Sequence, residues 1–390
     1  MLRMPEFKAP DFTRLKYTAA PRVKTVPAPA DGVLPEDFYA TTIYPEFFKL
    51  AGGWTLIENA RMDCAAVVKG ARVFAVEARR VKQGDAVVVG RAEDLSNGVC
   101  IVTDGFCAAE RRASQAFAFR TERSRETASS QDYDRLCDIL RHDRDRGHIV
   151  WVLGPAVDFD RNAREAMAGL IRNGYAHAIF AGNALATHDL EAALFHTGLG
   201  QDIYTKELVF NGHYHHLDAI NRARRAGSVG KLIKQEGIAD GILAACVEKN
   251  VPFVLAGSIR DDGPLPGVIS DVYEAQDAMR AHTIRATTII GLATQLHSIA
   301  TGNMTPTWQR VAGDVRPVYF YTVDISEFAV NKLRDRGSLA VNSIVTNVQD
   351  FLVNTSRSLI PAFGAAARCR LADAARGEKR AVTLGAGAKA

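Results

Sequence analysis

The strongest constraint on the fold is a unit that recurs along the second half of the sequence: a short apolar run, a turn with glycine and polar residues, and a helix. Residues 149–153 (IVWVL) have the pattern of a buried strand, GPAVDFD follows, and residues 162–172 have the apolar spacing of a helix. Neighbouring parallel strands need a crossover connection, which a helix provides. The pattern therefore predicts an α/β domain with a doubly wound parallel sheet. Further strands of this sheet are expected at residues 176–180, 251–255, 288–291, 318–324 and 343–346.

The sequence before this domain has a different pattern of residues. Short β-prone runs separated by Gly, Asp, Asn and Arg predict a small β-rich (α+β) domain, with strands at residues 54–58, 64–68, 73–77, 86–89 and 98–102. The polar stretch TERSRETASSQD is the expected domain boundary. We therefore divide the chain into an extended lead-in (1–35), a β-rich domain (36–125), an α/β domain (133–360) and a flexible tail rich in Ala, Gly and Arg (361–390).

Composition narrows the class of protein. Apolar residues make up 47% of the 390 residues and charged residues 24%, as in folded globular proteins. The net charge of +4 is scattered along the chain, so we expect no nucleic-acid partner. No window approaches the ~20 apolar residues of a membrane span, and the N-terminus lacks the apolar run of a signal peptide. The six cysteines form no CxxC pair, which indicates a reducing, cytoplasmic setting (Cys64, Cys100, Cys107, Cys137, Cys246 and Cys369).

Three loops follow predicted strands and combine glycine with polar side chains: 154–158 (GPAVD), 182–189 (GNALATHD) and 257–264 (GSIRDDGP). Ligands of open α/β sheets bind beyond the carboxyl ends of the strands, where glycines allow a backbone to approach a phosphate closely. Neither GxGxxG nor GxxxxGK[ST] occurs in the sequence. Each loop alone could be an ordinary tight turn, but three in one domain favour a nucleotide ligand.

Two groups of side chains in these loops are candidates for catalysis. His188 and Asp189 lie near the start of a predicted helix, where they are either an acid–base pair or a helix cap beside a hydrogen-bonded histidine. Arg260 can grip a carboxylate, and Asp261 and Asp262 can attract an ammonium group. An amino acid carries both groups. The alternative for RDDGP is a plain surface turn.

A run of histidines raises the question of a metal. His213, His215 and His216 lie in NGHYHHLDAIN, and imidazole is a common metal ligand. No Asp, Glu or Cys stands at a fixed spacing from the run, and the residues after it form a good amphipathic helix. We therefore expect no metal site.

Several segments resemble one known family. GNALATHDLE, NGHYHHLDAINRARRAGS, PFVLAGSIRDDGPLPGVISDVYEAQDAMR, LHSIATGNMTP and KLRDRGS are similar to the LOR/SDH-like, or archaeal-type, ornithine cyclodeaminases. They also resemble the C-terminal module of arginine dihydrolase/ornithine cyclodeaminases. The similarity covers about Leu34 to Leu352. It implies a β-rich N-terminal domain joined to an NAD-binding domain resembling deoxyhypusine synthase. It also implies conversion of L-ornithine to L-proline and ammonia, within arginine/ornithine metabolism and proline biosynthesis.

The resemblance also implies cofactor contacts, at Asn183, Ala184, Asp262, Asn303, Met304 and Asp324. The loop and strand-end positions complete the expected NAD-binding set, with Gly154, Asp158, Gly182, Gly257, Ser258, Thr305 and Thr346. Two positions depart from the family pattern: Asn331 stands where we expect Thr, and Asn347 where we expect Asp. If Asn347 lines the pocket, the missing negative charge puts recognition of a cationic substrate in doubt.

The mechanism we expect recycles the cofactor within one turnover. A hydride leaves the α-carbon of ornithine for NAD⁺, ammonia is lost as the ring closes, and the same hydride reduces the cyclic imine. The protein must then grip the carboxylate (Arg260), hold the ammonium (Asp261) and move protons (His188 or Asp189).

Other readings of the sequence stay open. One is an NAD-dependent amino-acid or opine-type dehydrogenase that releases NADH, and another is an NAD-binding regulatory protein without turnover. Lysine or a related diamino acid could replace ornithine, because one methylene changes binding by only ~1–3 kcal/mol. A homo-oligomer is expected from base rates alone.

Overall fold

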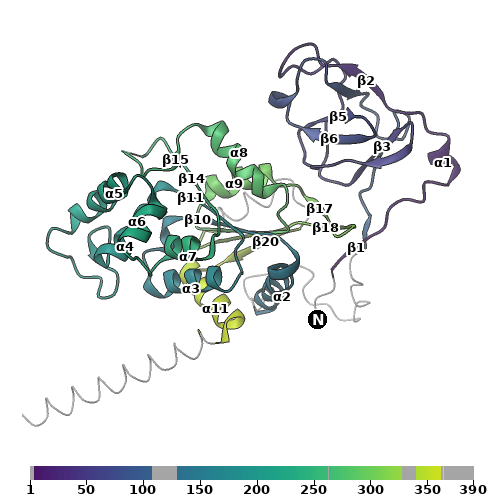
Figure 1. Ribbon diagram of the computed structural model, residues 1–390. Coiled ribbons are helices and arrows are strands. Elements are labelled where there is room, and N and C mark those ends of the chain that lie inside the picture. Colours follow the sequence, from purple (N-terminus) through teal and green to yellow (C-terminus); the bar gives the residue numbers. More distant parts are fainter. Residues whose placement is uncertain (1–3, 108–129, 262, 327–339, 362, 364–390) are drawn as a thin grey trace, which may run out of the picture.

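The computed structural model describes residues 4–107, 130–261, 263–326, 340–361 and 363. They form a smaller β-rich N-terminal domain and a larger α/β domain (Figure 1). The expected boundary between the two domains falls mostly outside the described residues, and only Pro361 and Phe363 of the expected tail are described. Within the described residues, no helix has the length and hydropathy needed to cross a membrane.

The α/β domain is built on a seven-stranded sheet in which every neighbouring pair is parallel. From β10 at the centre, the chain first adds strands on one side and then returns to add strands on the other. This order confirms the doubly wound sheet. In spatial order the strands are β15 (Val268–Ile269), β14 (Phe253–Ala256), β11 (Ala178–Gly182), β10 (Ile149–Leu153), β16 (Thr288–Leu292), β19 (Tyr319–Asp324) and β20 (Ala340–Val345).

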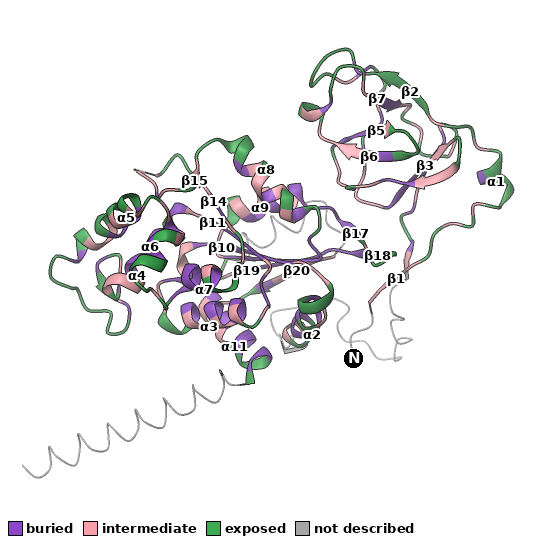
Figure 2. Ribbon diagram, in the orientation of Figure 1, coloured by how far each residue is buried: buried purple, intermediate pink, exposed green. Residues whose placement is uncertain are grey.

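Helices cover both faces of this sheet, because successive side chains of a buried strand point to opposite faces. Trp151 of β10 packs into one hydrophobic cluster, whereas Val150 and Val152 pack into another. The burial of both faces is visible in Figure 2. The first face carries α2 (Ser130–Arg146), α3 (Arg161–Arg172), α7 (Ile242–Lys249) and α11 (Val348–Leu359), and the second carries α8 (Val272–Thr283) and α9 (Gln295–Met304). Three more helices lie beyond the β11 side of the sheet: α4 (Asn183–Phe195), α5 (His215–Ala226) and α6 (Val229–Gln235).

The N-terminal domain contains two antiparallel sheets, and the five strands expected from sequence are present within about two residues of the expected limits. The first sheet has the order β2 (Lys24–Pro27), β7 (Ala86–Val89), β5 (Ala65–Lys69) and β6 (Arg72–Val76). The second has the order β4 (Gly53–Leu56), β3 (Glu46–Leu50) and β8 (Val99–Ile101). A further pair joins β1 (Glu6–Phe7) to β9 (Phe106–Cys107).

The segment expected to be an extended lead-in, residues 1–35, contains packed elements in its described part. Strand β2 pairs with β7, and Tyr17, in the short helix α1 (Leu15–Thr18), is buried in the N-terminal core. The ammonium group of Lys49 donates hydrogen bonds to three backbone carbonyls of this segment, those of Tyr17, Thr18 and Ala20. All four residues of β2 are exposed, so the strand lacks the alternating apolar pattern that would reveal it in sequence.

A hairpin of the α/β domain reaches the N-terminal domain. It consists of β17 (Trp308–Val311) and β18 (Asp314–Pro317). Trp308 is buried within the hydrophobic cluster of the N-terminal domain, and the hydroxyl of Thr307 donates to the carbonyl of Ile43. The two domains therefore share part of one core.

Candidate functional site

The carboxyl ends of β10 and β16 lie side by side where the strand order reverses, which is where open α/β sheets bind ligands. Gly154 follows β10, and a Cβ atom there would lie 2.1 Å from the carbonyl oxygen of Ala293, which follows β16. Gly182 ends β11, and a Cβ atom there would lie 3.2 Å from Cε1 of His297. Glycine is required at Gly154 because the two loops approach so closely. The two glycines thus allow the loops at the switch point to pack closely, and their contact with a cofactor stays a prediction.

Helix α4 starts directly at the end of β11, without a connecting loop. Its N-cap residue is Gly182, so no side chain caps the first amide groups of the helix. Asn183 is buried, and its Oδ1 accepts hydrogen bonds from the amide of Leu265 (2.9 Å) and the hydroxyl of Thr187 (3.3 Å). This anchors α4 to the loop that follows β14, while Ala184 is exposed. Uncapped amide groups at a helix start favour an anion such as a phosphate.

The loop after β14 has the geometry of a structured turn. Oδ2 of Asp261 accepts a hydrogen bond of 2.9 Å from the amide of Ser258, and the amide of Asp261 donates to the carbonyl of Ser258. Gly257 is held close to β15, since a Cβ atom there would lie 2.9 Å from the carbonyl oxygen of Ile269. The side chain of Arg260 is exposed, and Asp262 lies outside the described residues. The turn therefore fixes the backbone around Asp261 and leaves Arg260 facing solvent.

His297 is a group near the site that sequence reasoning did not single out. It lies in the first turn of α9, beside Gly182, and it is partly buried. Burial lowers the pKa of His297, and the nearby charge of Asp261 opposes that shift. A predicted strand followed by ATQLH gives no signal that distinguishes this histidine from any other at a helix start.

Asp189 does not have the surroundings of a proton-transfer group. Its Oδ1 accepts hydrogen bonds from Nε of Arg164 (2.6 Å) and the amide of Ile242 (2.9 Å), and its Oδ2 accepts from the amide of Leu243 (2.7 Å). The carboxylate thus neutralises a buried guanidinium and caps the first turn of α7. The helix-cap alternative describes this residue, although the capped helix is α7 and not its own.

Asp158 has the opposite surroundings. It follows the short helical turn after β10 and is fully buried, and neither carboxyl oxygen has a hydrogen-bond partner within the described part of the chain. Burial and, to a smaller extent, the charge of Asp189 raise the pKa of Asp158 well above its usual range, against the influence of Arg164. The raised pKa favours the protonated form of Asp158, which can donate one hydrogen bond.

His188 is paired with an acidic residue that sequence reasoning missed. Its Nδ1 lies 3.0 Å from Oε2 of Glu191, one turn further along α4, and both side chains are buried. Burial acts to raise the pKa of Glu191, but hydrogen bonds from His188, Gly200 and Thr197 outweigh it and lower the pKa. The i,i+3 spacing of THDLE places both residues on one helix face and was the available signal.

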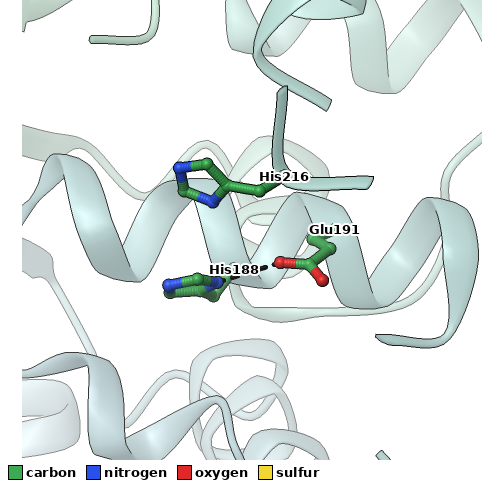
Figure 3. A group of neighbouring side chains, drawn as sticks. All are labelled: His188, Glu191 and His216. Atoms are coloured by element: carbon green, nitrogen blue, oxygen red, sulfur yellow. Dashed lines mark hydrogen bonds and ion pairs between the residues drawn. The ribbon is translucent and has the colours of Figure 1, made fainter. Parts of the chain in front are cut away.

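The ring of His216, from α5, lies beside this pair (Figure 3). The centroids of the His188 and His216 rings are 5.1 Å apart. Burial, and then the proximity of His188, lower the pKa of His216. The other two histidines of the run have other ring neighbours: the ring of His213 lies tilted against that of Tyr214, and His215 stacks on Phe195.

The remaining predicted cofactor contacts fall into two places. Asp324 ends β19 and Thr346 follows β20, so both lie at the carboxyl edge of the sheet, and Asp324 accepts a hydrogen bond from the amide of Ser326. Asn303, Met304 and Thr305 instead lie at the far end of α9, about 15 Å from its first residue. Met304 is buried against the face of the sheet. Their contact with NAD stays a prediction.

Of the two residues that depart from the family pattern, Asn347 is described in the structure and Asn331 is not. Asn347 is exposed and is the N-cap of α11, where its Oδ1 accepts a hydrogen bond of 2.8 Å from the amide of Gln349. Asp and Asn both serve well in that position, so the cap tolerates this exchange. Asn331 lies outside the described residues.

Comparison with known proteins agrees with this architecture. The family described as arginine dihydrolase ArgZ-like, C-terminal, Rossmann fold matches residues 135–355, and the first region of the same C-terminal part matches residues 45–131. The ornithine cyclodeaminase of Methanopyrus kandleri is 43% identical over 88% of this chain and 81% of its own length. The chain belongs to the archaeal-type ornithine cyclodeaminase family. The resemblance inferred from the sequence motifs is thus confirmed.

Solved structures of this family show the same fold. The LOR/SDH protein of Methanococcus maripaludis is 37% identical, and the match covers 87% of this chain and 98% of that protein with a TM-score of 0.77. The ternary complex of AgrE with ornithine and NAD⁺ is 36% identical over 88% of this chain and 46% of AgrE, with a TM-score of 0.54. AgrE is a bifunctional arginine dihydrolase/ornithine cyclodeaminase of Nostoc. The further likeness of the cofactor domain to deoxyhypusine synthase stays a prediction.

Proposed function

We propose that this protein is an ornithine cyclodeaminase that converts L-ornithine to L-proline and ammonia and recycles NAD within each turnover. The observation that carries the proposal is the switch point of the sheet, where the loops after β10 and β16 pack closely at Gly154 and where α4 starts at Gly182 without a side-chain cap. The support from relatives is the 43% identity with an ornithine cyclodeaminase and the AgrE complex that holds both ornithine and NAD⁺.

The residues at the switch point fit a dinucleotide. Any side chain at Gly154 would clash with the carbonyl of Ala293, so glycine allows the loops after β10 and β16 to meet at the switch point. The amide groups at the start of α4, near Asn183 and Ala184, suit a pyrophosphate, and Asp324 at the end of β19 suits ribose hydroxyls. When bound, NAD supplies a hydride acceptor and donor. The protonated form of Asp158, which its raised pKa favours, can donate a hydrogen bond after the turn that follows β10.

The chain's own residues bind, orient and move protons. In our proposal His188 is the proton-transfer group and Glu191 positions it. The carboxylate of Glu191 accepts a hydrogen bond from Nδ1–H of His188, which leaves a lone pair on Nε2 able to take a proton. The exposed guanidinium of Arg260 would bind the substrate carboxylate, and Asp261, fixed by the turn, would attract the ammonium group.

The deciding experiment mixes purified protein and NAD⁺ with L-ornithine, and with L-lysine in a parallel sample. Mass spectrometry follows proline and ammonia, while absorbance follows NADH. We expect proline and ammonia in equal amounts without net NADH. Accumulation of NADH would replace the proposal by an amino-acid dehydrogenase, and binding of NAD without consumption of any amino acid would replace it by a regulatory role.

We also propose a cytoplasmic protein that self-associates. Four free, buried cysteines among the described residues (Cys64, Cys100, Cys137 and Cys246) suit a reducing compartment. Two neighbouring apolar side chains between α4 and α5, Leu208 and Phe210, are 83% and 88% exposed, which suits a contact with a second copy.

A further inference from the structure

His188, Glu191 and His216 bring three metal-ligating side chains together. One ligand atom from each lies within 4.8 Å of the other two. Helix α4 supplies two of them from consecutive turns, and α5 supplies the third from the opposite side (Figure 3). No metal site was expected at the histidine run, because no Asp, Glu or Cys stands at a fixed ligand spacing from it in the sequence. The fold supplies an acidic partner from α4.

Two details of the cluster point to a ligand. Nδ1 of His216 is buried and has no hydrogen-bond partner among the described residues, which is unfavourable for a polar atom. Nδ1 of His188 and Oε2 of Glu191 are already 3.0 Å apart, close to the spacing of two ligands on one ion. A buried lone pair next to a carboxylate and a second imidazole is the arrangement that a cation satisfies.

Hydrogen bonds to the carboxylate of Glu191 fix its orientation, as outer hydrogen bonds do for carboxylates that bind metals. Its other oxygen, Oε1, accepts hydrogen bonds from the hydroxyl of Thr197 (2.9 Å) and the amide of Gly200 (3.1 Å). Thr197 has one proton to give, so its oxygen accepts in turn from Nδ1 of His215 at 2.9 Å. These bonds occupy Oε1 and direct Oε2 toward the two histidines. Outer hydrogen bonds of this kind orient the ligands of metal sites.

We propose that His188, Glu191 and His216 bind one divalent transition-metal ion of the Zn²⁺ class, with a fourth position left to water. Two imidazoles and one carboxylate are a known ligand set for zinc with an open position. Bonds of about 2.0–2.2 Å in a tetrahedral site place ligand atoms roughly 3.4 Å apart. To reach that value the 3.0 Å pair of His188 and Glu191 would widen slightly, and ligand atoms up to 4.8 Å apart would approach each other.

The ion would inhibit the enzyme, and this part rests on the proposed function. A neutral histidine that ligates through Nδ1 carries its proton on Nε2, and one that ligates through Nε2 has given up that lone pair. Either way His188 can no longer accept a proton. Metal binding and proton transfer at His188 therefore exclude each other.

The test begins with binding, which needs no activity. Full-length protein is treated with a chelator, dialysed and titrated with Co²⁺, whose visible absorption strengthens when the ion moves from six water ligands to a four-coordinate site. Zn²⁺ is then added as a competitor, and calorimetry gives its affinity. We expect one ion per chain and loss of the Co²⁺ spectrum on addition of Zn²⁺. Absence of a four-coordinate spectrum, or binding of several weak ions, would overturn the proposal.

Variants separate the cluster from the rest of the histidine run. His216→Ala and Glu191→Gln should each weaken Zn²⁺ binding at least about 10-fold, with folding checked by circular dichroism. The matched control is His213→Ala, which removes an exposed histidine three residues away and should leave the affinity unchanged. If His213→Ala weakens binding as much as His216→Ala does, the ion is an adventitious surface ion only, and the proposal is wrong.

The effect of the ion on enzyme activity is measured in a separate experiment. In the ornithine assay, one equivalent of Zn²⁺ should suppress turnover, and chelator should restore it. Turnover that rises with Zn²⁺ would overturn the inhibitory role. A protein that binds the ion as expected but converts no ornithine, with or without chelator, would contradict the proposed function and leave the metal site standing.

Discussion

Glu46 is a buried carboxyl group of the N-terminal domain whose two oxygens have unequal surroundings. The hydroxyl of Tyr39 and the amide of Thr42 donate to Oε1 at 3.0 and 2.7 Å, while Oε2 has no partner among the described residues. Burial raises the pKa of Glu46 to about 7, against the hydrogen bonds from Thr42 and Tyr39, which lower it. The folded protein therefore holds this proton more tightly than the unfolded chain, whose pKa is near 4.5.

This shift predicts how stability depends on pH. The contribution of Glu46 to stability is fully present below about pH 4.5 and is lost as pH rises through about 7, by up to about 3 kcal/mol. Glu46→Gln keeps the acceptor at Oε1 and removes the titration. Urea unfolding of both proteins between about pH 4.5 and 8 should show the variant gaining stability relative to the wild type as pH rises. Parallel curves would mean that Glu46 does not titrate in this window.

The second residue-scale prediction concerns His188. With chelator present, His188→Ala should lower kcat for ornithine about 10²-fold or more, because acid–base help of that size is lost, while NAD binding is retained. Calorimetry measures NAD affinity and steady-state kinetics measure turnover. The control is His213→Ala, which lies outside the buried pair. Unchanged turnover in His188→Ala would remove this residue from the mechanism.

Residues also show where sequence reasoning stops. His188 was a candidate from sequence, and its partner Glu191 could have been found from the i,i+3 spacing on one helix face. His216 could not, because its approach to the pair depends on how α4 and α5 pack. Asp189 was predicted to be catalytic, but its hydrogen bonds to Arg164 and to α7 are tertiary contacts with no signal in THDLE.

At the scale of elements, α7 begins in an unusual way. Its N-cap residue is Gly241, with φ of 112°, and a Cβ atom there would lie 2.2 Å from a guanidinium nitrogen of Arg164. The first amide groups of the helix are bound instead by Asp189 of α4. One carboxylate thus joins three helices, because Arg164 belongs to α3.

Asp189→Asn should therefore destabilise the protein by about 3–5 kcal/mol, since it leaves the buried guanidinium of Arg164 without its buried counter-charge. Asp240→Asn is the matched control, because Asp240 pairs with the same guanidinium but its side chain is 49% exposed. The control should cost less than about 1 kcal/mol. Urea unfolding compares the two variants, and equal losses would show that Asp189 has no special part in joining the helices.

The pattern of elements explains why the α/β domain was easier to predict than the rest. Strands such as β10 are buried on both faces, so they read as short apolar runs, and the six strands predicted there are present. Strand β15 has two partly buried residues, and β2 has exposed residues throughout. Strand β15 is only two residues long, and β2 lacks an alternating apolar pattern. Each is held by backbone pairing to a neighbour that sequence alone does not identify.

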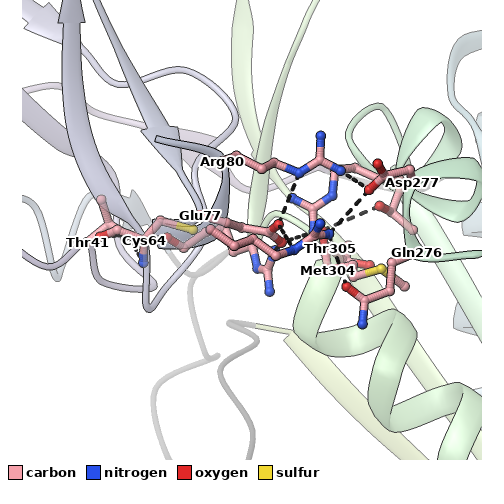
Figure 4. A network of polar contacts seen from close by, with 12 residues as sticks. Thr41, Cys64, Glu77, Arg80, Gln276, Asp277, Met304 and Thr305 are labelled. Atoms are coloured by element: carbon pink, nitrogen blue, oxygen red, sulfur yellow. Dashed lines mark hydrogen bonds and ion pairs between the residues drawn. The ribbon is translucent and has the colours of Figure 1, made fainter. Parts of the chain in front are cut away.

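At the scale of the whole molecule, a charged network joins the two domains. Glu77, which follows β6, contacts Arg61 and Arg80 of its own domain and Arg280 of α8. Arg80 also contacts Asp277 of α8. Figure 4 shows Glu77 reaching from the N-terminal domain toward the helix that carries Asp277. The carboxylate of Glu77 thus forms ion pairs with guanidinium groups from both domains.

Loss of this carboxylate should uncouple the domains. Glu77, Arg61 and Arg280 have side chains only 11%, 18% and 16% exposed, so Glu77→Gln would leave two shielded guanidinium groups facing each other without a counter-charge. We expect a loss of about 3–5 kcal/mol in the free energy of unfolding. Since Trp308 also lies in the N-terminal core, the wild-type domains should melt together.

Differential scanning calorimetry tests this prediction directly. The wild type should melt in one transition, and Glu77→Gln should show an earlier transition for the N-terminal domain. The control is Arg72→Gln, which breaks an exposed ion pair with Glu58 inside the N-terminal domain and should cost no more than about 1 kcal/mol. If Glu77→Gln melts in one transition at the wild-type temperature, the hydrophobic contact of Trp308 alone couples the domains. A wild type that already melts in two transitions would show that neither contact does.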